Sequence, residues 1–83
     1  MPITVKVLYF GQAKEAAGRA EEEVSLPDSA SIRLLVEHSK KAHPDLDGLS
    51  GVMRVAVNTE VAKAEDRLAD GDVVAFLPPV AGG

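Results

Sequence analysis

The sequence contains no cysteine and has few basic residues, and each shortage excludes a class of function. Without cysteine the chain has no disulfide, no thiolate metal site and no cysteine nucleophile. Nine lysine and arginine residues stand against thirteen aspartate and glutamate residues, which gives a formal net charge of −4. Nucleic-acid binding depends on basic surface that displaces counterions from phosphates, and the longest basic run is Lys40-Lys41. We therefore expect no nucleic-acid partner.

Long apolar runs are missing as well. No stretch approaches the ~20 residues needed to cross a bilayer, and Met1 leads directly into alternating sequence rather than into a secretory signal. We therefore expect a cytoplasmic protein with no membrane partner.

The length predicts one domain, because chains divide into several domains only well above ~200 residues. A hydrophobic content of 46% argues against disorder. A chain of 83 residues leaves little room for a deep pocket lined by several catalytic groups. It is better suited to act as a module of a larger complex than as a complete enzyme.

Hydrophobic periodicity predicts five strands and one main helix. Period-two alternation and apolar runs bounded by turn residues predict strands over 3–10, 21–26, 52–57, 61–62 and 72–77. The stripe formed by Ile32, Leu35, Val36 and Ser39 predicts a helix over 32–43, capped by Ser31 or alternatively by Ser29 and stopped by Pro44. A short helix over 12–17 ends at Gly18, residues 45–51 read as polar loop, and 64–68 as a loop or single helical turn.

This order of elements predicts an α+β domain over residues 1–77, with one helix across one face of a mixed sheet. The order is typical of the β-grasp (ubiquitin-like) fold, with the first and last strands as central neighbours. The uncharged face of the first strand, which includes Tyr9, should meet the core. By the same alternation Val74 and Phe76 point inward and Leu77 points outward. We expect the acidic run 21–23 to be a solvated edge.

Most residues that carry chemistry lack the spacing that an enzyme needs. No serine lies in a glycine-flanked nucleophile elbow, and no glycine fingerprint for phosphates is present. His38 and His43 are five residues apart, which does not place two imidazoles on one helix face. The aspartates at 66, 70 and 72 lack the alternation of a calcium loop. We expect no metal site.

The C-terminal segment 78–83 is the most unusual part of the sequence. Prolines at 78 and 79 favour an extended chain, and the final pair Gly82-Gly83 lacks side chains that would block a narrow channel. Six extended residues reach roughly 18–20 Å. The segment is either a thin probe carrying a terminal carboxylate or an ordinary frayed terminus.

Several segments together resemble the molybdopterin synthase small subunits, a family of ubiquitin-like sulfur carriers. The resemblance covers the whole chain and is carried by Tyr9-Phe10-Gly11, Val55-Ala56-Val57-Asn58, Asp70-Gly71-Asp72 and the closing run Phe76-Leu77-Pro78-Pro79-Val80-Ala81-Gly82-Gly83. Leu34 and Ser39 depart from the family pattern, where an acidic cap and a larger apolar residue are common. Both departures concern the helix more than the function.

The resemblance implies a sulfur-donating subunit of a transferase complex that is not an enzyme by itself. An ATP-dependent activating enzyme, similar to the ubiquitin-activating type, would adenylate Gly83, and a sulfur donor would convert it to a thiocarboxylate. Gly82 would allow Gly83 to reach into the partner. The chain would dock on a large subunit and deliver the sulfur to precursor Z, which forms the dithiolene of molybdopterin. The family suggests two small and two large subunits, no permanently bound cofactor, and ATP with magnesium used by the activating enzyme.

The resemblance also implies a docking surface. Leu77 points outward beside the C-terminal segment, and Phe10 and Val61 join it if the ends of their strands lie alongside. Residues Pro78, Pro79, Val80 and Ala81 would then contact the partner as well. The competing interpretation is a set of isolated surface hydrophobes, which are common.

Three other functions remain open at this point. A sulfur carrier for thiamin synthesis or tRNA thiolation would use the same terminal chemistry. A ubiquitin-like modifier would join Gly83 to a lysine through an isopeptide bond. A binding module with an inert terminus would form neither a thiocarboxylate nor an isopeptide bond.

Overall fold

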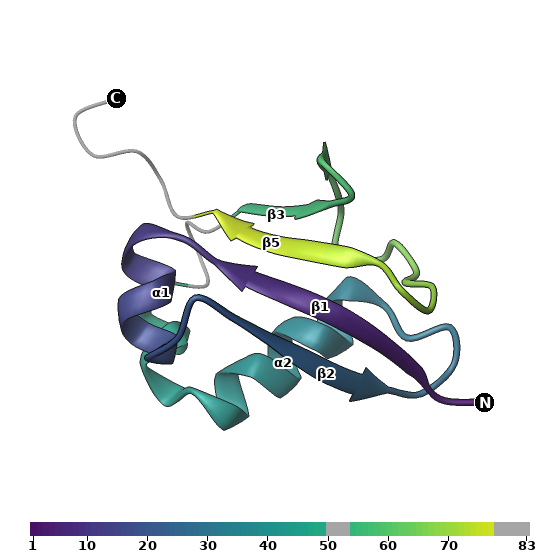
Figure 1. Ribbon diagram of the computed structural model, residues 1–83, viewed down its shortest axis with the longest axis horizontal. Coiled ribbons are helices and arrows are strands. Elements are labelled where there is room, and N and C mark those ends of the chain that lie inside the picture. The colour runs from purple at the N-terminus through teal and green to yellow at the C-terminus, as the bar shows by residue number, and fades with distance from the viewer. Residues whose placement is uncertain (50–53, 78–83) are drawn as a thin grey trace.

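A computed structural model describes residues 1–49 and 54–77, and it consists of one five-stranded sheet with helices on one side (Figure 1). The elements are β1 (Ile3–Tyr9), α1 (Gly11–Ala17), β2 (Glu21–Leu26), α2 (Ile32–Ala42), the 3-10 helix η1 (Pro44–Leu49), β3 (Arg54–Val57), β4 (Glu60–Val61) and β5 (Val73–Leu77).

The strand order is β2-β1-β5-β3-β4, so the first and last strands are neighbours at the centre of the sheet. β1 and β5 run parallel, with Tyr9 opposite Phe76, while β2 and β3 flank them in antiparallel orientation. This topology, with α2 across one face, is the β-grasp, and the α+β prediction is confirmed.

The core lies between the sheet and α2. On β1 the buried side chains alternate strictly with exposed or half-buried ones, and Val5 and Val7 are completely buried. Val74 and Phe76 of β5 are also completely buried, as alternation predicted. Leu35 of α2 packs against them and is likewise inaccessible to solvent.

The cap of α2 is Ser31, whose Oγ accepts a hydrogen bond from the backbone N–H of Leu34 at 3.2 Å. The alternative cap, Ser29, instead adopts a left-handed φ of +62° in the preceding turn. The helix ends at Ala42, and the N–H of His43 bonds the carbonyl of Ser39 at 2.8 Å. The predicted boundaries are therefore correct to one residue.

The predicted polar loop over 45–51 is wrong over its described part. Residues Pro44–Leu49 form the 3-10 helix η1, and Leu46 is completely buried between two aspartates in the sequence. Proline cannot continue α2, but it fits the first turn of a new helix because its missing N–H would have no partner there. Residues 50–53, which include the start of the predicted third strand, lie outside the described residues.

The bounds of four other elements, β1, α1, β4 and β5, differ from the predicted ones by one residue. Phe10 follows β1 as the N-cap of α1, which begins at Gly11. The reversal after β3 takes two residues instead of three, so β4 is Glu60–Val61 and not 61–62. β5 begins at Val73. The segment 64–68 is loop that includes one bridge, Arg67 to Ser31.

The acidic run on β2 is not uniformly solvated, which corrects a second expectation. Glu21 and Glu23 are exposed, but Glu22 shares the inward face with Val24 and is half-buried. Its carboxylate accepts a hydrogen bond from the Tyr9 hydroxyl at 2.5 Å and contacts His43 Nε2 at 2.7 Å. These two hydrogen-bonding partners offset the cost of burying the Glu22 carboxylate.

Candidate partner-binding site

The face of the sheet opposite α2 carries an apolar hollow of about 610 Å³. The hollow spans the three central strands and the hairpin between β3 and β4. It is lined by Leu8, Phe10, Ala56, Asn58, Thr59, Val73, Ala75 and Leu77.

Strand alternation explains why these side chains gather. Val73, Ala75 and Leu77 alternate with the buried residues of β5, so they point to the face that no helix covers. Ala75 lies opposite Leu8 on one side and opposite Ala56 on the other. Two alanines at the centre are too small to fill the space between the larger side chains around them, which leaves the hollow.

Phe10 and Leu77 both line this hollow. Phe10 is 46% exposed and is held between β1 and α1 by extended backbone, while its carbonyl accepts the N–H of Ala13 at 3.0 Å. Leu77 is the last residue of β5 and is half-buried. Two large apolar side chains therefore lie at the end of β5.

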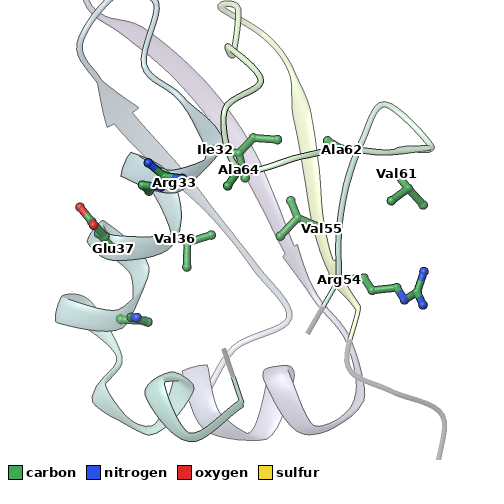
Figure 2. A pocket seen from close by; sticks show the side chains of 10 residues that line it. Ile32, Arg33, Val36, Glu37, Arg54, Val55, Val61, Ala62 and Ala64 are labelled. Atoms are coloured by element: carbon green, nitrogen blue, oxygen red, sulfur yellow. The ribbon is translucent and has the colours of Figure 1, made fainter. Parts of the chain in front are cut away.

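Val61 does not line this hollow. It is 69% exposed on the edge strand β4, and it borders a second groove of about 490 Å³ between α2 and β3–β4. Figure 2 shows Val55 pointing toward α2 in that groove, whereas Arg54 and Val61 point away from the helix. The structure thus brings together two of the three predicted docking hydrophobes.

The polar cluster around Glu22 supports the inner side of the same region. The ring of Tyr9 packs edge-on against Phe76 at 5.5 Å and against His43 at 5.8 Å. Burial raises the pKa of Tyr9, and its hydrogen bond to Glu22 raises it further. Burial acts to raise the pKa of Glu22 too, but hydrogen bonds from Tyr9 and His43 outweigh it, so this pKa is lowered. The cluster is an anchor, because all its groups are engaged with one another.

Residues 1–49 and 54–77 contain no group of three or more His, Cys, Asp or Glu side chains that could hold a metal ion. His38 is exposed, while His43 is engaged with Glu22, so the two histidines do not form one site. Within the same residues, no helix is long and apolar enough to cross a membrane.

Comparison with known proteins then decides the family. The ThiS family model matches residues 7–83. The chain belongs to the ThiS family. Among curated relatives, the molybdopterin synthase sulfur carrier subunit of Chlamydomonas reinhardtii is 40% identical over 81 residues, covering 95% of this chain and 98% of the relative. The subunit of the same name from Mycobacterium tuberculosis is 39% identical over 82 residues, covering 98% and 99%.

Solved structures of similar sequence agree in fold. A putative molybdopterin converting factor subunit 1 from Pyrococcus furiosus superposes with a TM-score of 0.86 at 36% identity, covering 94% of this chain and 99% of that one. SAMP1 from Haloferax volcanii, a small archaeal modifier protein, gives 0.84 at 28% identity, covering 96% and 99%. A complex of subunits 1 and 2 of the molybdopterin-converting factor from Helicobacter pylori gives 0.70 at 26%, covering 98% and 100%.

Within this ThiS-family chain, the remaining predicted site residues lie outside the described residues: Pro78, Pro79, Val80, Ala81, Gly82 and Gly83. Sequence reasoning missed six residues that line the hollow, namely Leu8, Ala56, Asn58, Thr59, Val73 and Ala75. Alternation along β1 and β3 indicates Leu8 and Ala56 once the inward face is known. The two hairpin residues depend on the exact length of the turn.

Proposed function

We propose that this chain is the sulfur carrier subunit of a molybdopterin synthase, with sulfur carried at Gly83. The observation that supports the proposal most strongly is the end-to-end similarity to curated sulfur carrier subunits, at 40% identity over 95% of the chain. The hollow beside Leu77 adds a physical argument, because a carrier has to dock on a partner close to the residue where its reactive segment begins.

The chemistry requires activation of the terminus. A free carboxylate is a poor electrophile, because attack would have to expel a strongly basic oxide. In the proposed sequence a carboxylate oxygen of Gly83 attacks the α-phosphorus of ATP and releases pyrophosphate. A sulfur nucleophile at the oxidation level of sulfide then attacks the acyl-adenylate and releases AMP, leaving a thiocarboxylate.

Delivery follows from tethering. The domain docks on the large subunit through the hollow that contains Phe10 and Leu77, and Val61 extends the contact if the interface reaches the sheet edge. Residues Pro78, Pro79, Val80 and Ala81 enter the partner, and Gly82 leaves room for the terminus to reach precursor Z. A tethered nucleophile acts at a high effective concentration, which free sulfide does not reach.

The proposal includes partners and conditions. An adenylyltransferase similar to the ubiquitin-activating enzymes uses ATP with magnesium, and the carrier itself holds no permanent cofactor. Two small and two large subunits form a heterotetramer in the cytoplasm. A complex of subunits 1 and 2 has been solved for the Helicobacter pylori relative, which supports pairing with a large subunit.

A second candidate function is protein modification. It is favoured by the similarity to SAMP1, which is named a modifier protein, at 28% identity and a TM-score of 0.84. A modifier would use the same adenylate but transfer Gly83 to a lysine amine. A carrier for thiamin synthesis or tRNA thiolation would share the thiocarboxylate and differ only in the acceptor.

Intact mass spectrometry tests the proposal. The chain is incubated with its activating enzyme, ATP, magnesium and a sulfide source, and one oxygen should be exchanged for sulfur. A chain that lacks Gly82 and Gly83 is the matched control and should keep its original mass. The thiocarboxylate form should then convert precursor Z in the presence of the large subunit.

Two outcomes would contradict the proposal. If the truncated chain supports precursor Z conversion as well as the full chain does, no acyl transfer through Gly83 is involved. If cells yield Gly83–lysine conjugates and the thiocarboxylate form does not convert precursor Z, the chain is a modifier.

A further inference from the structure

The hollow on the open face of the sheet has opposite charges on its two flanks. Strand register places Arg54 of β3, which also borders the groove between α2 and β3–β4, on one flank. It places Glu21 and Glu23 of β2 on the other flank. The apolar residues of β1 and β5 lie between these flanks, because the strand order is β2-β1-β5-β3. The face is therefore polarised across the strands.

Arg54 is placed beside the start of the C-terminal segment. It lies directly opposite Leu77 in the β3–β5 register, so both side chains belong to the same face. It is exposed, and Figure 2 shows its side chain pointing away from α2. Within residues 1–49 and 54–77 its guanidinium forms no ion pair, in a chain whose net charge is −4.

The acidic flank retains one unpaired carboxylate. Lys6 Nζ contacts Glu21 Oε2 at 2.9 Å, and this hydrogen bond, together with the charge of Glu21, raises the pKa of Lys6. Glu23 lies opposite Lys6 in the β1–β2 register, and its charge adds to the rise in the pKa of Lys6, but it is exposed and no ion pair joins it to another described residue. One positive and one negative group are thus available, on opposite sides of the hollow.

We infer that Arg54 orients the large subunit on this face, by pairing with a carboxylate of that subunit next to Leu77, while Glu23 faces a cationic group of the same partner. The inference rests on the proposed function. Apolar contact alone does little to fix how a partner is rotated on this face, because it has no direction. Opposite charges on two flanks do fix it, since the reversed orientation brings like charges together.

Orientation matters here because residue 78 is joined to Leu77, the residue opposite Arg54. A partner rotated on the hollow would meet the C-terminal segment away from its own catalytic cavity. Arg54 is therefore a positioning residue for sulfur delivery, and it does not itself touch the reacting atoms.

The test measures association of the purified carrier with its large subunit by surface plasmon resonance at several salt concentrations. For Arg54→Gln we expect the association rate constant to fall by on the order of tenfold at low salt, with a flatter salt dependence. Arg54→Glu should lower it further, and Glu23→Gln should have a smaller effect of the same kind. Arg33→Gln is the matched control, because Arg33 is an exposed arginine on α2, on the other side of the sheet.

The double variant Arg54→Glu with Glu23→Arg keeps the net charge of the wild type and reverses the two flanks. It should bind the large subunit more weakly than Arg54→Glu alone or Glu23→Arg alone. With saturating large subunit, its thiocarboxylate form should also convert precursor Z more slowly than the wild type. Thermal unfolding of the Arg54 single variants and of Glu23→Gln should match the wild type, since both positions are exposed. Glu23→Arg places a cation opposite Lys6, so the double variant is assayed well below its own melting temperature.

The outcomes separate the two proposals. If the wild-type carrier does not bind the large subunit at all, the proposed function fails. If the wild type binds, but Arg54→Gln matches Arg33→Gln in rate and salt dependence, only the inference about Arg54 is overturned. It is also overturned if Arg54→Gln impairs adenylation by the activating enzyme and leaves association with the large subunit unchanged.

Discussion

Glu22 joins four segments of the chain through one carboxylate. It accepts from the Tyr9 hydroxyl on β1, contacts His43 at the end of α2 at 2.7 Å, and pairs with Arg19 at 3.3 Å. The Ser39 hydroxyl nearby acts to lower the pKa of Tyr9, although it is buried and has no hydrogen-bond partner of good geometry among the described residues. We therefore expect an ionised Glu22 to stabilise the fold.

We predict that Glu22→Gln destabilises the domain by about 1–2 kcal/mol at neutral pH, because an amide replaces a charged acceptor. The pKa of Glu22 is lowered from its usual 4.5, so the unfolded chain binds this proton more readily than the folded one. Its contribution is complete above pH 4.5 and disappears as the pH falls through the lower, folded pKa. Urea unfolding at a series of pH values should show the wild type approaching Glu22→Gln below that point.

The control for this prediction is Glu23→Gln, which changes the neighbouring, outward-facing carboxylate of the same strand. Its stability should stay within about 0.5 kcal/mol of the wild type at every pH. A constant difference between wild type and Glu22→Gln down to pH 3 would show that the ionised form of Glu22 is not what stabilises the fold.

At the scale of elements, the hairpin between β3 and β4 combines a good turn residue with a poor one. Asn58 and Thr59 both have left-handed backbone, with φ of +50° and +78°. Asn58 suits this conformation and ties the turn to β5, since its Oδ1 accepts the Val73 N–H at 3.0 Å. Thr59 does not suit it, because a β-branched side chain crowds the backbone at positive φ.

We predict that Thr59→Gly stabilises the domain by about 1 kcal/mol, because the change produces the Asn-Gly pair that two-residue hairpins favour. The melting temperature should rise by about 4–8 °C for a domain of this size. Thr59→Ala is the control, since alanine keeps the β-carbon and should gain much less. Equal melting temperatures for the alanine and glycine variants would show that positive φ is not the source of strain.

How far the sequence predicts such elements depends on whether the information is local. Alternation and capping are local, so the inward face of β1 and the Ser31 cap followed from the residues themselves. The central pairing of the first and last strands followed instead from the order of elements, which is typical of the β-grasp. The burial of Leu46 did not, because a single leucine between two aspartates has no period, and only the packing of η1 against α1 and α2 decides its place. Glu22 shares the parity of Val24, but a carboxylate is usually exposed, so its charge alone does not indicate the inward position that its hydrogen bonds allow. The hollow depends on two alanines facing each other across strands, which requires the register.

At the scale of the whole molecule, the two faces of the sheet differ in what covers them. The face under α2 contains the core, whereas the open face contains the hollow. Side chains of β5 alternate between the two faces: Phe76 points into the core, and Leu77, the last residue of the strand, points to the open face. A substitution on the open face can thus separate docking from folding.

We predict that Leu77→Asp weakens binding to the large subunit by about tenfold or more, because a charge would be buried in an apolar contact without a partner. The fold should stay intact, since Leu77 already lies on the open face. Leu34→Asp is the matched control, because Leu34 is 38% exposed on α2, away from the hollow. Isothermal titration calorimetry gives the affinities, and circular dichroism melts check folding. If Leu77→Asp binds as tightly as Leu34→Asp and both melt like the wild type, the hollow is not the surface that holds the partner.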